Sequence, residues 1–314
     1  MFHSQRNSFA GKGQLTEIFR SEKDGFPLVG LRSEVVEISI VPALGARVFS
    51  LFNRHTRREW MWSASEKRKL FPNAFGDAFE QGTLTGADEC IPTILPCRWK
   101  GRDLPDHGEV WSRSWQLDEK DLAAEKLTTS VTLPLTPFLL TRTISLNNAD
   151  LRFDYQLESK APESEPFLWS WHPLLCFEDG DYFELPSPTE DLKVEIALNP
   201  TGARGETWPV ERLRQMAGSQ DGFLKAFVPA GNGKAALVHG KTKERLELSW
   251  NPDQLPWLGI WITRGGWNGY HHAALEPTHG APDALDVAVE QWRAHATLAC
   301  GETTHWHMNI HLTE

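Results

Sequence analysis

The chain has 314 residues, a formal net charge of −10, and 40% hydrophobic and 24% charged residues, which is an ordinary globular composition. An acidic chain is a poor ligand for nucleic acids and anionic membranes, because phosphates need Lys and Arg to neutralise them. No stretch approaches the roughly 20 apolar residues of a membrane span. We therefore expect neither nucleic acid nor a membrane as a partner.

The N-terminus lacks the apolar core of a secretory signal, and the four cysteines show no metal-finger spacing. A cytoplasmic protein with reduced thiols is the simplest interpretation. Residues 1–33 are polar and glycine-rich, so we expect an irregular N-terminal segment there, with at most one edge strand. Residues 82–115 are rich in Gly, Pro and Asp, and a long irregular segment inside a compact domain is usually functional.

Elsewhere, short stretches of alternating apolar and polar residues predict β-strands separated by turns. The expected strands are 35–41, 46–52, 127–135, 139–146, 151–158, 166–173, 223–229, 234–239, 244–250, 258–263, 271–276, 291–298 and 305–312. The best helix candidate is 207–216, with Thr207 as cap and Pro209 in the first turn. The pattern predicts an all-β fold, a large antiparallel β-sandwich formed by one domain over residues 1–314.

Two ionisable residues stand at predicted strand ends, each followed by a proline: His172 and Glu276. Proline cannot donate to a strand ladder, so we expect the second strand to stop at Glu276. Alternation places His272, Ala274 and Glu276 on one face of that strand. With His107 in a Pro-Asp-His-Gly turn, the chain offers two imidazoles and a carboxylate, which suffice for acid–base catalysis near neutral pH.

Tryptophan is unusually common, with 14 Trp against 3 Tyr. Indole rings suit large cores and equally suit stacking on the C–H faces of sugars. The Trp residues placed in predicted loops, Trp267, Trp111 and Trp99, are the better ligand candidates, and Trp261 lies on the strand before the Trp267 loop.

The last strand projects His305, His307 and His311 from one face, a spacing that can chelate a metal. No carboxylate or cysteine is placed nearby in the sequence to complete such a site. We interpret this face as exposed to solvent and expect no metal.

Several segments resemble the aldose 1-epimerase (galactose mutarotase-like) superfamily. They are VPALGARVFSL (41–51), GADECIPTILP (86–96), LPDHGEVW (104–111), WSWHP (169–173) and ALEPTHGAPD (274–283). The resemblance extends from about residue 35 to the C-terminus. It implies a large antiparallel β-sandwich with an open sugar cleft.

The resemblance also implies roles for three residues. His172 matches the general acid of the superfamily, Glu276 its general base, and His107 the histidine that assists near the ring oxygen. The implied reaction interconverts the α and β anomers of a free aldose, and needs neither a metal nor a redox cofactor. A small-molecule sugar is the implied partner.

The chain departs from the superfamily at two places. Pro173-Leu174-Leu175 replaces the aromatic pair that usually follows the second histidine. Where a sugar-binding arginine is usual, the chain has Asp88 and Glu89. The substrate-binding candidates are therefore Asp88, Glu89, Arg47, Arg264, Trp261 and Trp267.

Two other functions stay open at this point. A hexose-phosphate epimerase would need a basic pocket, for which Arg98, Lys100, Arg102 and Arg264 are candidates. A non-catalytic sugar-binding protein could use the same fold. The sequence specifies neither the sugar nor the oligomeric state.

Overall fold

The computed structural model describes residues 16–313. Of the N-terminal segment expected to be irregular, residues 1–15 lie outside the described residues. The expectation is wrong for most of the remainder, where β1 (Glu17–Lys23) and β2 (Phe26–Arg32) form a hairpin at the edge of a sheet.

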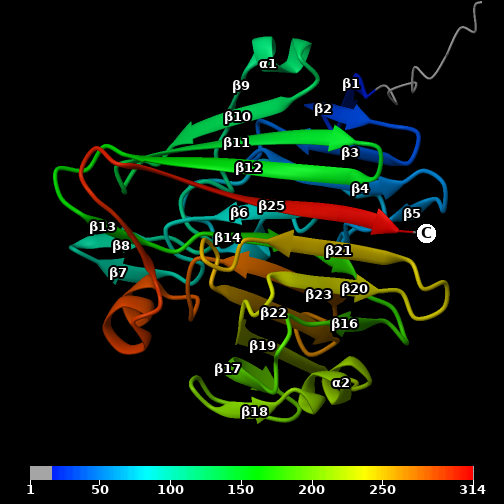
Figure 1. Ribbon diagram of the computed structural model, residues 1–314, viewed down its shortest axis with the longest axis vertical. Helices are drawn as coiled ribbons and strands as arrows, with labels where there is room; N and C mark the ends of the chain where they lie inside the picture. The colour runs from blue at the N-terminus through cyan, green and yellow to red at the C-terminus, as the bar shows by residue number, and fades with distance from the viewer. Residues whose placement is uncertain (1–15, 314) are drawn as a thin grey trace, which may run out of the picture.

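Two large antiparallel sheets face each other and make up most of the fold (Figure 1). The larger sheet contains, in spatial order, β1, β2, β3 (Val36–Val41), β4 (Arg47–Asn53), β6 (Ala87–Cys90), β14 (Ser170–Pro173), β23 (His271–Thr278), β22 (Trp257–Arg264), β19 (Gly222–Pro229), β17 (Asp191–Leu198) and β18 (Thr207–Pro209), with β5 (Arg58–Glu59) beside β4 and β15 (Leu175–Cys176) beside β23. The second sheet contains β16 (Tyr182–Glu184), β20 (Lys234–Val238), β21 (Arg245–Trp250), β25 (Thr303–Thr313), β12 (Asp150–Ser159), β11 (Phe138–Asn147), β10 (Leu127–Thr132) and β9 (Gln116–Leu117).

Smaller elements complete the chain. They are the pairs β7 (Cys97–Trp99) with β8 (Arg102–Leu104) and β13 (Glu165–Phe167) with β24 (Ala296–Leu298), the helices α1 (Glu119–Ala123), α2 (Glu211–Ala217) and α3 (Leu285–Val287), a 3₁₀ turn, η1 (Phe79–Gln81), and a π-helical turn, η2 (Ala288–Trp292). Strands account for 49% of the structure and helices for 8%, which confirms the predicted antiparallel β-sandwich.

The hydrophobic core lies between the two sheets and follows the alternation in the sequence. On β12, Leu151, Phe153, Tyr155 and Leu157 are buried while the residues between them are not. The other sheet contributes residues such as Leu275 of β23 to the same core cluster. The opposite face of β23 is therefore free to form part of a site.

Four element predictions need correction. β23 continues through Pro277 to Thr278, and Pro277 stands opposite Leu258 of β22. A proline is compatible with an extended strand where no ladder donor is required of it. The segment 207–216 divides into β18 and α2, because Thr207–Pro209 pairs with β17 and the helix begins only at Glu211. The segment 166–173 divides into β13 and β14, and most of 291–298 is not a strand.

Within residues 16–313, no helix has both the length and the apolar composition needed to cross a membrane.

Candidate active site

The outer face of β23 carries the residues that alternation predicted. Ala273 and Leu275 belong to the core cluster, so His272, Ala274 and Glu276 occupy the other face. On the neighbouring strand β22, Gly259 stands opposite Glu276 and Trp261 opposite Ala274. Glycine and alanine at these two positions leave space above the middle of the sheet.

A cavity of about 300 Å³ occupies this space. Its wall is formed by Ala78, Phe79, Glu80, Ile94, Leu95, Asp106, His107, His172, Leu174, Glu195, Ile196, Lys225, Trp261, Trp267, His272 and Asp283. The lining comes from strands of the larger sheet and from the irregular segments before and after β6. The prediction that these irregular segments contribute to a site is consistent with this arrangement.

Glu276 lies beneath the wall of the cavity and is only 1% exposed. Its Oε2 accepts a hydrogen bond from Lys225 Nζ at 2.5 Å and a longer one from Ser170 Oγ at 3.5 Å. Its Oε1 has no hydrogen-bond partner among the described residues and lies 3.9 Å from His172 Nε2. A buried carboxylate oxygen without a partner is unfavourable, so it is well suited to accept a proton or a hydroxyl from a ligand.

Lys225 reaches Glu276 from two strands away. It stands on β19, opposite Trp261 of β22, and Gly259 lies between it and the carboxylate. A Cβ atom on residue 259 would lie 3.2 Å from Glu276 Oε2. Any larger residue at this position would therefore crowd the Lys225–Glu276 ion pair.

Asp283 adds a second carboxylate to Lys225, with Oδ1 lying 3.5 Å from Nζ. Burial raises the pKa of Asp283 to about 7, although the Lys225 charge acts in the opposite direction. Burial alone would lower the pKa of Lys225, but the charges of Asp283 and Glu276 reverse the effect and raise it. The ammonium group therefore stays charged and holds both acids at the cavity floor.

His172 and His107 meet across the cavity, with ring centroids 4.8 Å apart and ring planes at 86°. His107 stacks on Phe79 at 3.8 Å, and its Nδ1 contacts Asp106 Oδ1 at 2.9 Å. Asp106 Oδ2 accepts a bond from the backbone N–H of Phe79. Both the plane and the rotation of the His107 ring are fixed by these contacts.

The turn that presents His107 has a left-handed backbone. His107 has φ +55° and Gly108 φ +76°, and the Gly108 N–H closes the turn on the carbonyl of Pro105. A Cβ atom on Gly108 would lie 2.2 Å from the carbonyl oxygen of Ile91, so only glycine fits there. Left-handed non-glycine residues are uncommon and often found at functional sites.

The pKa values of His172 and Asp106 are both lowered, for different reasons. Burial lowers the pKa of His172 well below its ordinary value, and the charges of His107 and Lys225 act in the same direction. Burial tends to raise the pKa of Asp106, but hydrogen bonds and charge from His107 outweigh it and lower the pKa. A neutral His172 therefore stands beside His107, which the Asp106 carboxylate can orient.

The structure brings together five of the predicted residues. His172, His107, Trp261 and Trp267 line the cavity. Glu276 lies beneath the wall, with its Oε1 3.9 Å from Nε2 of His172. The two indole rings are 6.0 Å apart and perpendicular.

The other predicted substrate-binding residues lie outside this cavity. Arg47 forms an ion pair with Asp88 at 2.9 Å, and Arg142 binds Glu89 at 2.9 Å, all four side chains being fully buried. Such pairs occupy the sandwich interior, where each charge needs a partner. Arg264 binds Asp179 beside a separate hollow. These placements take Arg47, Asp88, Glu89 and Arg264 out of the candidate site.

Two tryptophans proposed as ligand candidates are also placed elsewhere. Trp111 is 1% exposed and donates its indole N–H to the backbone carbonyl of Asp106, so it supports the His107 turn. Trp99 lies on β7, outside the cavity wall.

Sequence reasoning missed Lys225, Asp283 and Asp106. A signal existed for Lys225, which is one lysine within the otherwise apolar run FLKAFVP of β19. Asp106 immediately precedes His107, and Asp283 ends the quoted segment ALEPTHGAPD. The roles of Lys225 and Asp283 depend on contacts between distant segments, which the sequence pattern does not contain.

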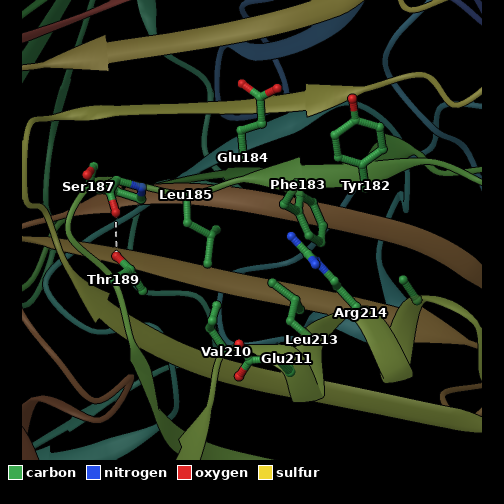
Figure 2. Close-up of a pocket in the computed structure, with 12 residues that line it drawn as sticks. Tyr182, Phe183, Glu184, Leu185, Ser187, Thr189, Val210, Glu211, Leu213 and Arg214 are labelled. Atoms are coloured by element: carbon green, nitrogen blue, oxygen red, sulfur yellow. Dashed lines mark hydrogen bonds between the residues drawn. The ribbon is translucent and has the colours of Figure 1, made fainter.

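A second hollow, of about 510 Å³, lies between β16 and α2 (Figure 2). The carboxylate of Glu184 points away from the apolar side chains of Leu185 and Leu213, and it pairs with Arg245. As far as residues 16–313 are concerned, no histidine lines this hollow. The smaller cavity at Glu276 is therefore the better candidate for acid–base chemistry.

Comparison with known proteins gives the fold. No family model and no curated protein sequence matches the chain. Solved structures do match over nearly the whole length. The Slr1438 protein from Synechocystis sp. PCC 6803 has a TM-score of 0.68 and 14% identity, with 100% of this chain and 99% of that chain covered. A galactose mutarotase-like protein from Lactobacillus casei has a TM-score of 0.65 and 18% identity, with 95% and 100% covered.

A galactose mutarotase-like protein from Clostridium acetobutylicum has a TM-score of 0.67 and 14% identity, with 97% of this chain and 100% of that chain covered. The chain has the galactose mutarotase-like fold. At these identities the sequence has diverged far from that of the similar structures. Any activity has to be argued from the residues of this chain.

Proposed function

We propose that this protein is an aldose 1-epimerase that interconverts the α and β anomers of a free aldose. One observation carries the proposal. Oε1 of Glu276 forms no hydrogen bond with the described residues, and it lies 3.9 Å from Nε2 of His172 at the same cavity. Mutarotation needs a base and an acid that reach two oxygens bonded to the same carbon. These two groups come from different strands and meet at such a spacing.

The reaction follows from these positions. Glu276 takes the proton from the anomeric hydroxyl while protonated His172 gives a proton to the ring oxygen, and the bond from C1 to the ring oxygen breaks. The open-chain aldehyde rotates about the bond between C1 and C2. On ring closure, the hydroxyl returns its proton to His172 and the new anomeric oxygen takes one from Glu276. Both groups end in their starting states.

His107 assists near the ring oxygen. The Asp106 carboxylate orients its Nδ1 side and leaves Nε2 available for a ligand. Phe79 and Trp267, which belong to the cavity wall, supply flat apolar surfaces for the C–H faces of the sugar.

The charge of the cavity supports a free sugar over a sugar phosphate. Four carboxylates line it, those of Glu80, Asp106, Glu195 and Asp283, against the single ammonium group of Lys225. Lys225 is itself bound to Glu276 and Asp283. The cations considered for a phosphate pocket each contact an acid elsewhere, namely Asp103 for Arg98, Glu165 for Lys100 and Arg102, and Asp179 for Arg264.

Anomer exchange measured by NMR or polarimetry tests the proposal on a panel of free and phosphorylated aldoses. We expect exchange of a free aldose to be accelerated, and Glu276→Gln to lower the rate by about 10²- to 10⁴-fold, the usual contribution of a general base. Glu290→Gln, at an exposed carboxylate in η2, is the control and should keep the parental rate. Sugar binding without exchange would replace the proposal with the sugar-binding alternative.

A further inference from the structure

His272 is a buried histidine on the face of β23 that lines the cavity. It is 1% exposed, it lines the cavity, and neither ring nitrogen has a hydrogen-bond partner among the described residues. Buried polar groups in folded proteins are almost always paired, so an imidazole with two unpaired nitrogens requires an explanation.

The neighbours of His272 do not supply those partners. Aromatic rings surround it, with centroid distances of 4.5 Å to Trp62, 5.8 Å to Trp267 and 6.3 Å to Trp261. The hydroxyl of Thr263, which stands opposite His272 in the sheet, donates to the Tyr270 carbonyl and accepts from the backbone N–H of Trp267. Its one donor is used within the loop, and neither His272 nitrogen bonds to it.

The position of His272 relates it to the proposed reaction. It shares a strand face with Glu276, and a rise of about 3.3 Å per residue places the two Cα atoms roughly 13 Å apart. Only Ala274 lies between them on that face. A sugar whose anomeric carbon meets Glu276 and His172 would extend over Ala274 toward His272.

We propose that His272 binds a hydroxyl group of the sugar on the side of the ring remote from the anomeric carbon. This inference rests on the proposed function and adds a specificity-determining residue to it. Burial lowers the pKa of His272 to about 3, so its ring is neutral at neutral pH. A neutral imidazole has one N–H donor and one acceptor nitrogen, and a hydroxyl group can bond to either of them, whereas a carboxylate or phosphate group can only accept.

Two substitutions separate this role from a packing role. His272→Phe keeps an aromatic ring among the indoles but removes both nitrogens. His272→Gln loses the ring but keeps a donor and an acceptor. The matched control is His271→Phe, because His271 precedes His272 on the same strand and is exposed.

The kinetic experiment measures kcat/KM for anomer exchange with an accepted aldose and with deoxy analogues that each lack one hydroxyl group. We expect the parent to prefer the full sugar over one remote deoxy analogue by about 10-fold, the usual size of one lost hydrogen bond with a buried partner. His272→Phe should lose this preference, and His272→Gln should restore part of it. A preference that survives in His272→Phe for every analogue overturns the inference.

A direct reading comes from NMR of protein with ¹⁵N-labelled histidine, which does not depend on turnover. Addition of the aldose should shift the ring nitrogens of His272 and leave those of His271 unchanged. Binding and anomer exchange with no shift at His272 would overturn this inference and leave the proposed function standing. Binding with the shift but without exchange would support His272 as a sugar ligand and overturn the proposed function. No binding by any aldose would remove both.

Discussion

Lys225 binds one oxygen of Glu276 and leaves the other free. The ammonium nitrogen lies 2.5 Å from Oε2, while Oε1 has no partner within the described part of the chain. The contact fixes the rotation of the carboxylate and directs Oε1 toward His172. It also places a positive charge between Glu276 and Asp283, two acids that would otherwise repel each other.

We predict that Lys225→Met lowers kcat for anomer exchange by about 10- to 100-fold, part of the effect of losing a general base. Without the ammonium charge, nothing at Lys225 opposes the effect of burial on Asp283, so Asp283 takes up its proton at a higher pH. The acidic limb of the pH–rate profile should therefore move to higher pH. Lys225→Arg should restore the profile in part.

The control for that prediction is Lys193→Met, at a residue that stacks on Trp292 away from the cavity. Since removal of one partner from a buried ion pair costs about 3–5 kcal/mol, thermal unfolding of each variant has to be measured alongside. An unshifted pH profile in a folded Lys225→Met protein would contradict the role of Lys225.

The lowered pKa of His172 predicts the direction of the pH dependence. The protonated ring is the proposed acid, and burial together with nearby charge makes that form scarce at neutral pH. We expect kcat/KM to rise as the pH falls below neutrality, because a lower pH increases the fraction of His172 that is protonated. His172→Asn should remove this rise and cost about 10²- to 10⁴-fold in rate.

His107→Asn should cost less than His172→Asn, since His107 assists. The exposed His305 provides a control, and His305→Asn should behave as the parent does. A parental rate that falls steadily on acidification from neutral pH would count against His172 as the acid.

Trp261 and Trp267 line the cavity together, so sugar binding should change the intrinsic fluorescence of the protein. We predict that Trp267→Ala or Trp261→Ala loses most of this change in a titration. Trp99→Phe, outside the cavity wall, should keep it. A parental response in both cavity variants would place the sugar elsewhere.

We expect the buried His279 to make the stability of the fold sensitive to acid, independently of catalysis. It packs between Phe167 and Trp306 in the sandwich, and burial lowers its pKa to about 3. Below a pH of about 6.5, the unfolded chain binds a proton at this residue that the folded chain does not. The stability present at neutral pH is therefore lost as the pH falls from about 6.5 toward 3.

We expect His279→Phe to lose less stability on acidification than the parent, by up to about 1.4 kcal/mol per pH unit in that window. Urea unfolding at a series of pH values measures the difference. His305→Phe, at an exposed position, should follow the parent. If the free energies of unfolding of His279→Phe and the parent stay parallel between pH 6.5 and 3, His279 is not held neutral by burial.

The fold class could be predicted from the sequence because alternating apolar and polar residues indicate strands directly. The strand at 151–158 and the terminal strand bury the residues predicted for the core. The placement of His272, Ala274 and Glu276 on one strand face could be predicted equally well, because it depends only on the alternation of side chains along a strand. The limits of β23 were not, because Pro277 is tolerated by its particular partners in the sheet.

The supporting residues of the site could not be predicted for a physical reason. Lys225 reaches Glu276 only because β19, β22 and β23 are neighbours in this order and Gly259 lies between. Likewise, Arg47 and Asp88 neutralise each other inside the sandwich, so a plausible sugar-binding pair in the sequence has no charge to offer a ligand. Registers between distant strands decided both outcomes.

The positions along the chain of the strands that hold the candidate site affect how the site forms during folding. β14, β19 and the consecutive strands β22 and β23 come from three well-separated stretches of the chain, and the turn with His107 precedes all of them. Closing such long loops is entropically unfavourable, and folds dominated by distant pairings form slowly. During refolding, far-UV circular dichroism should therefore recover before the rate of anomer exchange, which requires every one of these strands to be in register. No fragment that ends before Glu276 could carry the proposed chemistry, however much of the sandwich it forms.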